Sequence, residues 1–347
     1  MGFGMWRCQT FRSLRGHRAC AASLGVRAAV LGLFSVDVAC GDAGGRLLST
    51  ARSRDTAGGG STASPLGQTA AASRLLFACV GDTRPPLEDD TADYPTAVIS
   101  RIFEQIEGLR PHPPFAIATG DYVFASEHSA TAAVAQFDLY LQARMGYSGA
   151  LFPAMGNHEC TGATTSNCGP EGMSGQNPNY NAFLQKMLAP IGQSQPYYAV
   201  RVDSAPGATK AWTAKFVVVA ANAWSAAQES WLESALAQPT TYTFVIRHEP
   251  AAANTAPGVT PSEAVMARHP YTLSIVGHTH TYRHSADTPR EVVIGNGGAP
   301  LVAKDYGFGL FTQQSDGTIA VDVLNWQTAL PDPQFHFAVK ADGSAAP

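Results

Sequence analysis

The sequence predicts an α/β protein (α+β by some schemes), built as a four-layer α/β/β/α sandwich of two mixed sheets flanked by helices. Three observations predict this class. Apolar runs with the length of buried strands recur along the chain, and apolar stripes with helical spacing lie between the early runs. Additional short strands follow one another towards the C-terminus. Early alternation and late additional strands together favour two mixed sheets whose outer faces are covered by helices.

The individual elements are expected in a definite order. The first strand covers 75–80, and the helix after it runs from about residue 94 to 107, because Val98, Ile102 and Ile106 lie on one stripe. Further helices are expected near 130–143, 180–188 and 226–236, and further strands at 115–120, 150–156, 197–202, 212–221, 242–247, 273–277, 291–294, 310–313, 318–325 and 335–339. The strands at 197–202 and 212–221 are expected to pair antiparallel.

Five of the apolar runs end on a residue that can bind a metal ion. These residues are Asp82, Asp121, Asn157 with His158, His248, and the pair His278 and His280. A side chain just past the C-terminal end of a strand lies where open α/β sheets build their sites. Five independent placements of this kind predict one shared metal centre. Carboxylate, amide and imidazole ligands together suit Zn, Mn or Fe, and they suit Ca poorly.

The charge of these ligands indicates an anionic substrate. Asp82 and Asp121 are the two anionic ligands, and the others are neutral. Two divalent ions would leave the site at about +2, or about +1 with a bridging hydroxide. A pair of metal ions can clamp the attacking and leaving oxygens of a phosphoester. The sequence therefore predicts metal-dependent phosphoester hydrolysis, by in-line attack of metal-bound hydroxide at a dinuclear centre. His278 and His280 reach both metals only if the chain turns just after Gly277.

The same residues resemble the calcineurin-like metallophosphoesterase superfamily, and most closely its purple acid phosphatase branch. The matching blocks, in the order of that branch, are Gly81-Asp82, Gly120-Asp121-Tyr122-Val123-Phe124, Gly156-Asn157-His158-Glu159, Val245-Ile246-Arg247-His248 and Gly277-His278-Thr279-His280. The resemblance covers roughly residues 75 to 298. It implies a two-sheet β sandwich flanked by helices.

The resemblance also implies a distinct role for each matching residue. Asp121 would bridge the two metals. Asp82 and His280 would complete the first metal site. Asn157, His248 and His278 would complete the second. His158 would bind no metal. It would donate a proton to the phosphate or to the leaving oxygen, as a general acid.

Two positions depart from the family pattern. Arg84 stands where most of the superfamily has a histidine, and Phe124 stands where the purple branch has a tyrosine. Neither fourth ligand is present, so the first metal is expected to be weakly held and to give no iron–tyrosinate colour. Arg84 is interpreted as a catalytic contact to the phosphate. A surface ion pair is the alternative for this arginine.

The N-terminal part of the chain is predicted to be a targeting segment. Residues 1–40 combine arginines with a short apolar stretch, as a secretory signal does. Val38-Ala39-Cys40-Gly41 resembles a bacterial lipoprotein cleavage site, which would attach the protein to a membrane through a lipidated Cys40. A disordered or mis-started leader is the alternative. A flexible Gly/Ser/Ala/Thr linker at 41–73, a metallophosphoesterase domain at 74–341 and a disordered tail at 342–347 are expected to follow.

Cys160 and Cys168 bracket a polar loop, and export would allow them to form a disulfide. Two free thiols, or a zinc–thiolate pair, are the alternatives. The formal net charge of -4 and the pI of about 6.2 provide no basic field for nucleic acid. A nuclease is therefore disfavoured.

Two functional hypotheses follow. The first is an exported phosphatase or phosphodiesterase, secreted or held in the cell envelope, with a phosphoester substrate. The loops 127–149, 161–179 and 251–261 would set its preference between monoesters and diesters. The second is a non-catalytic exported surface binding module with a degenerate first metal site, which the absent fourth ligand favours. The sequence indicates no oligomeric state.

Overall fold

The computed structural model describes residues 73–127, 130–169, 177–206, 208 and 210–346. The predicted leader at 1–40 and nearly all of the predicted linker at 41–73 lie outside the described residues, so the predictions of a signal and of a lipidated Cys40 stay predictions. None of the helices in the described part of the chain is long and apolar enough to span a bilayer.

Two six-stranded mixed sheets form the centre of the fold, which confirms the predicted class. The strands of the first sheet, in spatial order, are β12 (Pro331–Val339), β11 (Ile319–Asn325), β10 (Gly307–Gln313), β1 (Leu76–Val80), β2 (Phe115–Ala118) and β3 (Ala150–Pro153). Those of the second are β4 (Tyr198–Asp203), β5 (Thr213–Val218), β6 (Tyr242–Ile246), β7 (Leu273–Val276), β9 (Thr288–Ile294) and β8 (Tyr282–Ser285). In each sheet the strands that precede the predicted ligands are parallel neighbours.

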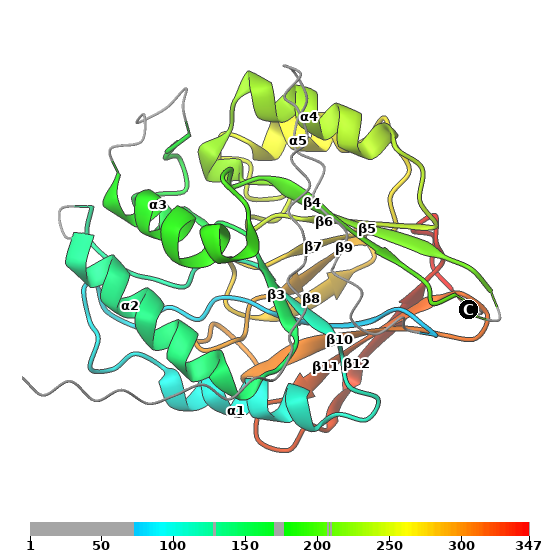
Figure 1. Cartoon of the computed structure of the whole chain (residues 1–347), viewed down its shortest axis with the longest axis horizontal. Helices are drawn as coiled ribbons and strands as arrows, with labels where there is room; N and C mark the ends of the chain where they lie inside the picture. Colours follow the sequence, from blue (N-terminus) through cyan, green and yellow to red (C-terminus); the bar gives the residue numbers. More distant parts are fainter. Residues whose placement is uncertain (1–72, 128–129, 170–176, 207, 209, 347) are drawn as a thin grey trace, which may run out of the picture. The chain divides into compact units, whose positions relative to one another are not determined.

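Helices cover both outer faces of the sandwich. They are α1 (Thr96–Gly108), α2 (Ala130–Ala143), α3 (Pro178–Phe183, continued by a π-helical turn at Leu184–Leu188), α4 (Ala226–Ala237) and α5 (Val259–Met266). Figure 1 shows α4 and α5 side by side against the second sheet, with α1 and α2 on the opposite side of the molecule. The parallel strands are therefore buried on both faces, which explains their continuous apolar runs.

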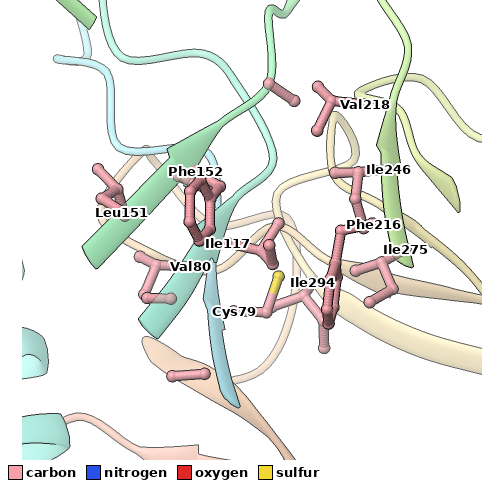
Figure 2. Close-up of a cluster of buried hydrophobic side chains, with 14 of the residues drawn as sticks. Cys79, Val80, Ile117, Leu151, Phe152, Phe216, Val218, Ile246, Ile275 and Ile294 are labelled. Atoms are coloured by element: carbon pink, nitrogen blue, oxygen red, sulfur yellow. The ribbon is translucent and has the colours of Figure 1, made fainter. Parts of the chain in front are cut away.

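Aromatic rings fill the space between the two sheets. Phe77 of β1 stacks on Phe311 of β10 with ring centroids 4.6 Å apart, and it meets Phe216 of β5 edge-on at 4.9 Å. Figure 2 shows the neighbouring part of this core, where Ile117 of the first sheet faces side chains of the second. Burial of this apolar surface fixes the two sheets face to face, and it therefore aligns the strand ends that carry the ligands.

Three details differ from the sequence-based expectations. The sequence does not predict β8, because the residues of this edge strand, Tyr-Arg-His-Ser, form no apolar run. It also does not predict α5, because Pro261 suggests a turn; a helix nevertheless accepts proline in its first turn. The predicted loop at 251–261 therefore runs into a helix. The predicted disordered tail at 342–347 is also wrong for the residues described: Ala345 forms a bridge with Val339, and Ala346 N–H donates to the carbonyl of Ala338 at 2.9 Å. The free edge of β12 supplies the partners for this pairing.

Candidate metal centre

The site lies where the two sheets present the ends of their parallel strands. The first sheet contributes the residues after β1, β2 and β3, and the second contributes those after β6 and β7. These are Asp82, Asp121 and Asn157 from the first sheet, and His248, His278 and His280 from the second. Each sheet thus supplies three of the six predicted ligands. The centre is held together by the packing of one sheet on the other.

The backbone turns sharply at four of these residues. Asp82 and Asp121 have φ of 56°, and His278 and His280 have φ of 72° and 46°. Left-handed backbone at a residue with a side chain costs of the order of 1–3 kcal/mol and is typical of functional sites. The turn predicted after Gly277 is therefore present. A Cβ at Gly277 would lie 2.5 Å from Asp82 Oδ2, so only glycine allows this approach.

The ligand atoms form two overlapping groups. In one, the donor atoms of Asp121, His248 and His278 all lie within 4.8 Å of one another; in the other, those of Asp82, Asp121 and His280 do. Asn157 Oδ1 joins the first group, because it lies 3.1 Å from His278 Nδ1. All six predicted ligands are thus brought together, and one carboxylate belongs to both groups. This is the arrangement expected of two adjacent cations that share a bridging carboxylate.

Backbone carbonyls fix the orientation of two imidazoles. His248 Nδ1 donates to the carbonyl of Thr119 at 2.8 Å, and His280 Nδ1 donates to that of Pro300 at 2.8 Å. Each ring therefore presents the lone pair of Nε2 to the carboxylates. His248 Nε2 lies 3.3 Å from Asp121 Oδ1. Such outer contacts are typical of histidines that bind metals, since they set the tautomer and the ring plane.

The electrostatics of the carboxylates favour a bound cation. Burial, with the nearby Asp121 carboxylate, raises the pKa of Asp82 well above its usual range. Burial alone would also raise the pKa of Asp121, but the imidazoles of His248 and His158 outweigh it and hold the pKa below its usual range. Burial and the neighbouring His248 lower the pKa of His278 to about 4, so this ring stays neutral. The nearby carboxylates raise the pKa of His248 despite its burial, so a proton is held between this imidazole and the carboxylates where a divalent metal ion could take its place.

The two positions that depart from the family pattern lie against each other. The Arg84 guanidinium lies over the Phe124 ring, 4.8 Å from its centroid. Arg84 Nε is buried with no hydrogen-bond partner among the described residues, and it lies 3.9 Å from Asp121 Oδ2. An unpaired donor at this place is suited to an oxygen of a bound anion.

His158 also contacts Phe124. The two rings meet edge-on with centroids 4.8 Å apart, and His158 Nε2 lies 4.0 Å from Asp121 Oδ2. Burial, together with the Arg84 guanidinium, lowers the pKa of His158 to about 4. The ring lies beside the ligands and belongs to neither donor group, and its role as a general acid that binds no metal stays a prediction.

The sequence did not reveal the role of Glu159. Its carboxylate accepts the backbone N–H groups of Asp121 at 2.9 Å, Tyr122 at 2.8 Å and Gly156 at 2.8 Å. It therefore ties the loop after β2 to the loop after β3. Burial and the Asp121 carboxylate raise its pKa to about 7. The Gly-Asn-His-Glu block contained this residue, but an acidic residue after a strand has no signal that separates a ligand from a backbone clamp.

Two further features lie next to the site. Tyr122 points into the core, where its hydroxyl donates to the carbonyl of Ala154 at 3.0 Å. Cys160 and Cys168 form a disulfide with an S–S distance of 2.09 Å, which excludes two free thiols and a zinc–thiolate pair at these positions.

Comparison with known proteins gives a family and a fold. A family model described as calcineurin-like phosphoesterase matches residues 75–282. The purple acid phosphatase PPD1 from yellow lupin (Lupinus luteus) seeds is similar in structure, with a TM-score of 0.56 and 13% identity over 80% of this chain and 55% of that one. GAP50, the anchor in the inner membrane complex of Plasmodium, gives 0.53 and 15% over 78% of this chain and 90% of that one. A dimetal phosphatase from Danio rerio gives 0.50 and 13% over 77% and 99%. At these identities the likeness shows the fold alone. The comparison with curated protein sequences gives no match.

Proposed function

Because the chain belongs to the calcineurin-like phosphoesterase family, we propose that it hydrolyses phosphoesters at a dinuclear metal centre. The observation that carries this proposal is the double membership of Asp121, which lies in both groups of candidate ligands. Bound metal ions would neutralise the charge of the phosphate and activate water. The purple acid phosphatase and the dimetal phosphatase share the fold, and the activities for which they are named agree with this chemistry.

The protein's own residues would divide the work as follows. Asp121 would contribute to both metal sites, Asp82 and His280 would complete the first, and Asn157, His248 and His278 would complete the second. The metal identity is proposed only as a divalent or Fe/Zn/Mn type, because carboxylate, amide and imidazole donors suit these ions. Backbone carbonyls hold two of these imidazoles in place, so the donor atoms are oriented before any ion binds.

Two further residues would act on the phosphoester itself. Arg84 presents a buried, unpaired Nε beside Asp121, where it can hold a phosphate oxygen. His158 donates a hydrogen bond to the leaving oxygen. Its pKa is low, and a dianionic phosphate beside the ring favours the proton that a general acid needs. Replacement of His158 by alanine should lower kcat more for an alkyl phosphate than for an aryl phosphate with an acidic leaving group.

A hydrolysis panel tests the assignment directly. The purified protein is loaded in turn with Mn²⁺, Zn²⁺, Fe and Co²⁺ and assayed with an aryl phosphomonoester and an aryl phosphodiester. Asp121→Ala should lose turnover with both substrates. Asp138→Ala is the matched control, because Asp138 is an exposed partner of Lys186 far along α2. Activity that survives in Asp121→Ala would contradict the proposal.

One observation favours a second candidate, an exported surface binding module without catalysis. The first site has three candidate ligands, and Arg84 and Phe124 occupy the positions of the family's fourth ligands. GAP50, which shares the fold, is described as an anchor. Metal analysis separates the candidates. Two equivalents of metal with turnover support the enzyme, and one or none without turnover supports the module.

Export is part of the same proposal. The buried disulfide between Cys160 and Cys168 supports it, since such bonds persist in oxidising compartments. Cell fractionation of the full chain, with Cys40→Ala as comparison, tests both export and lipidation. The variant should move from the membrane fraction to the soluble one. A chain that stays in the cytoplasm in both forms would contradict export.

A further inference from the structure

The loop closed by the disulfide begins three residues after Asn157, a proposed ligand of the second site. Residues 160–168, called the disulfide loop below, follow the 3₁₀ turn at Asn157–Glu159. Both cysteines are fully buried, so the bond lies inside the protein rather than on its surface. The loop therefore connects the core of the fold to the edge of the metal centre.

A residue of the disulfide loop determines which way the Asn157 amide faces. Asn157 Nδ2 donates to the carbonyl of Gly162, and Gly162 N–H donates back to the Asn157 carbonyl at 3.0 Å. An amide whose nitrogen is held in this way must present its oxygen on the opposite side. That oxygen lies 3.1 Å from His278 Nδ1, among the ligands of the proposed second metal site. The Gly162 carbonyl is thus an outer contact of a metal ligand.

Gly162 is itself held in a conformation that suits glycine. Its φ is 84°, in the left-handed region, and a Cβ added there would touch the His158 ring at 3.5 Å. The loop backbone therefore packs beside the proposed general acid as well as bonding to Asn157. Gly162 has no side chain to anchor it, so its position depends on how the two ends of the loop are fixed.

Two sets of interactions fix the ends of the disulfide loop. The first is the disulfide, which joins the loop's first and last residues. The second is the buried Asn222, from the 3₁₀ turn that follows β5: its carbonyl accepts from Cys168 N–H at 2.7 Å, and its Nδ2 donates to the carbonyls of Thr164 at 2.9 Å and Ser166 at 2.8 Å. Both act within a few residues of Gly162 and hold its carbonyl towards Asn157.

We propose that the disulfide loop positions Asn157 and thereby sets the metal affinity of the second site. The inference rests on the proposed function for the existence of that site. Cys160, Gly162 and Cys168 are positioning residues here, because none of them is a candidate ligand. Without the bond, the Gly162 carbonyl loses one of its two restraints, and the contact that selects the oxygen of the Asn157 amide is weakened. Loss of an outer contact of this kind typically weakens metal binding tenfold to a hundredfold.

The experiment measures Mn²⁺ binding rather than activity. Metal-free protein is titrated with Mn²⁺, and free Mn²⁺ is followed by electron paramagnetic resonance. The double variant Cys160→Ser/Cys168→Ser should bind Mn²⁺ at the second site tenfold to a hundredfold more weakly than the unaltered chain. Val339→Ala is the control for lost stability. It removes buried apolar volume from β12, at the far edge of the first sheet, and should lower Tm without changing Mn²⁺ affinity.

Two further variants keep the test decisive if the double variant does not fold. Gly162→Ala leaves the disulfide intact but strains the left-handed backbone, and it should weaken Mn²⁺ binding in the same direction. In the Asn157→Asp background the amide donor to Gly162 is absent. If the loop acts through that amide, losing the disulfide should cost less affinity there than in the unaltered chain.

The outcomes separate this inference from the proposed function. Equal Mn²⁺ affinity in the unaltered chain, the double variant and Gly162→Ala, with only Tm lowered, would overturn the positioning role and leave the metal centre intact. Additive losses in the Asn157→Asp background would also overturn it. An unaltered chain that binds no Mn²⁺ would overturn the metal centre and the positioning role together.

Discussion

The two halves of the metal centre hold their ligands in different ways. In the second half, His248 is fully buried, its ring is fixed by the Thr119 carbonyl, and Asn157 is oriented by Gly162. Each of these ligands has an outer contact that leaves one donor atom facing the site. The second half is thus preorganised by backbone carbonyls, which set the donor atoms of its ligands before a cation binds.

The first half contains a cation of its own. The Arg84 guanidinium lies near Asp121 and is held over Phe124, so it cannot move far from that carboxylate. His280 is half-buried, and the side chain of Asp82 is fully buried. A metal ion between Asp82, Asp121 and His280 would be repelled by the guanidinium, whereas a phosphate would be attracted by both. The difference indicates that one half is built for metal affinity and the other for anion binding.

The largest expected effect comes from removing one histidine from each half. His248→Ala should lower kcat/KM by on the order of 10³-fold, because a lost metal removes several kcal/mol of charge stabilisation. His280→Ala should lower it less, since its site is proposed to bind metal weakly and Arg84 remains. Metal content per chain and kcat/KM are measured for both variants side by side. A larger loss for His280→Ala than for His248→Ala would reverse the comparison of the two halves.

The candidate ligands could be predicted from the sequence because each follows a buried apolar strand. A parallel strand buried on both faces leaves a continuous apolar run, and the polar residue at its end is conspicuous. Asp82, Asp121 and His248 are all of this kind, and the structure brings them together. The same signal cannot show which ligand belongs to which metal site. The division of ligands between the sites depends on how the two sheets pack, and the sheets bring together residues that are far apart in the sequence.

The sequence could not show the contacts that hold the candidate ligands in place. Glu159 accepts backbone N–H groups that carry no sequence signature, and Gly162 acts through its carbonyl. The contact between Arg84 and Phe124 joins loops that follow different strands. These interactions depend on backbone geometry, so a pattern of side chains does not reveal them. The left-handed φ of Asp82 and Asp121 belongs to the same class.

The next largest effect is expected from removing the Arg84 guanidinium. Arg84→Ala should lower kcat/KM for a phosphomonoester about tenfold to a hundredfold, which corresponds to the loss of a hydrogen bond between charged groups. Metal affinity of the first half should rise, or stay the same, because a repelling charge is gone. Arg101→Ala is a matched control, since Arg101 pairs with Glu104 on the exposed side of α1.

Arg84→Lys sharpens this test. A lysine keeps the charge but loses the planar fork that lies over Phe124, so partial recovery of kcat/KM is expected. Unchanged kcat and KM in Arg84→Ala with every phosphoester would show that the arginine is only an ion-pair partner of Asp121.

The smallest expected effect comes from restoring a ligand to the first half. Phe124 stands three residues after Asp121, at the position where the resembling branch carries a tyrosine. Phe124→Tyr adds a phenol, and a phenolate that reached the first metal should raise its affinity at least about tenfold, since even outer contacts of metal sites have effects of this size. The variant loaded with iron should also gain a visible absorption band that the unaltered chain lacks. Tyr306→Phe controls for the change in tyrosine content, because the Tyr306 ring packs edge-on against Trp326. An iron-loaded unaltered chain that already shows the band would mean that another tyrosine reaches the metal, and the first half would then be as complete as the second.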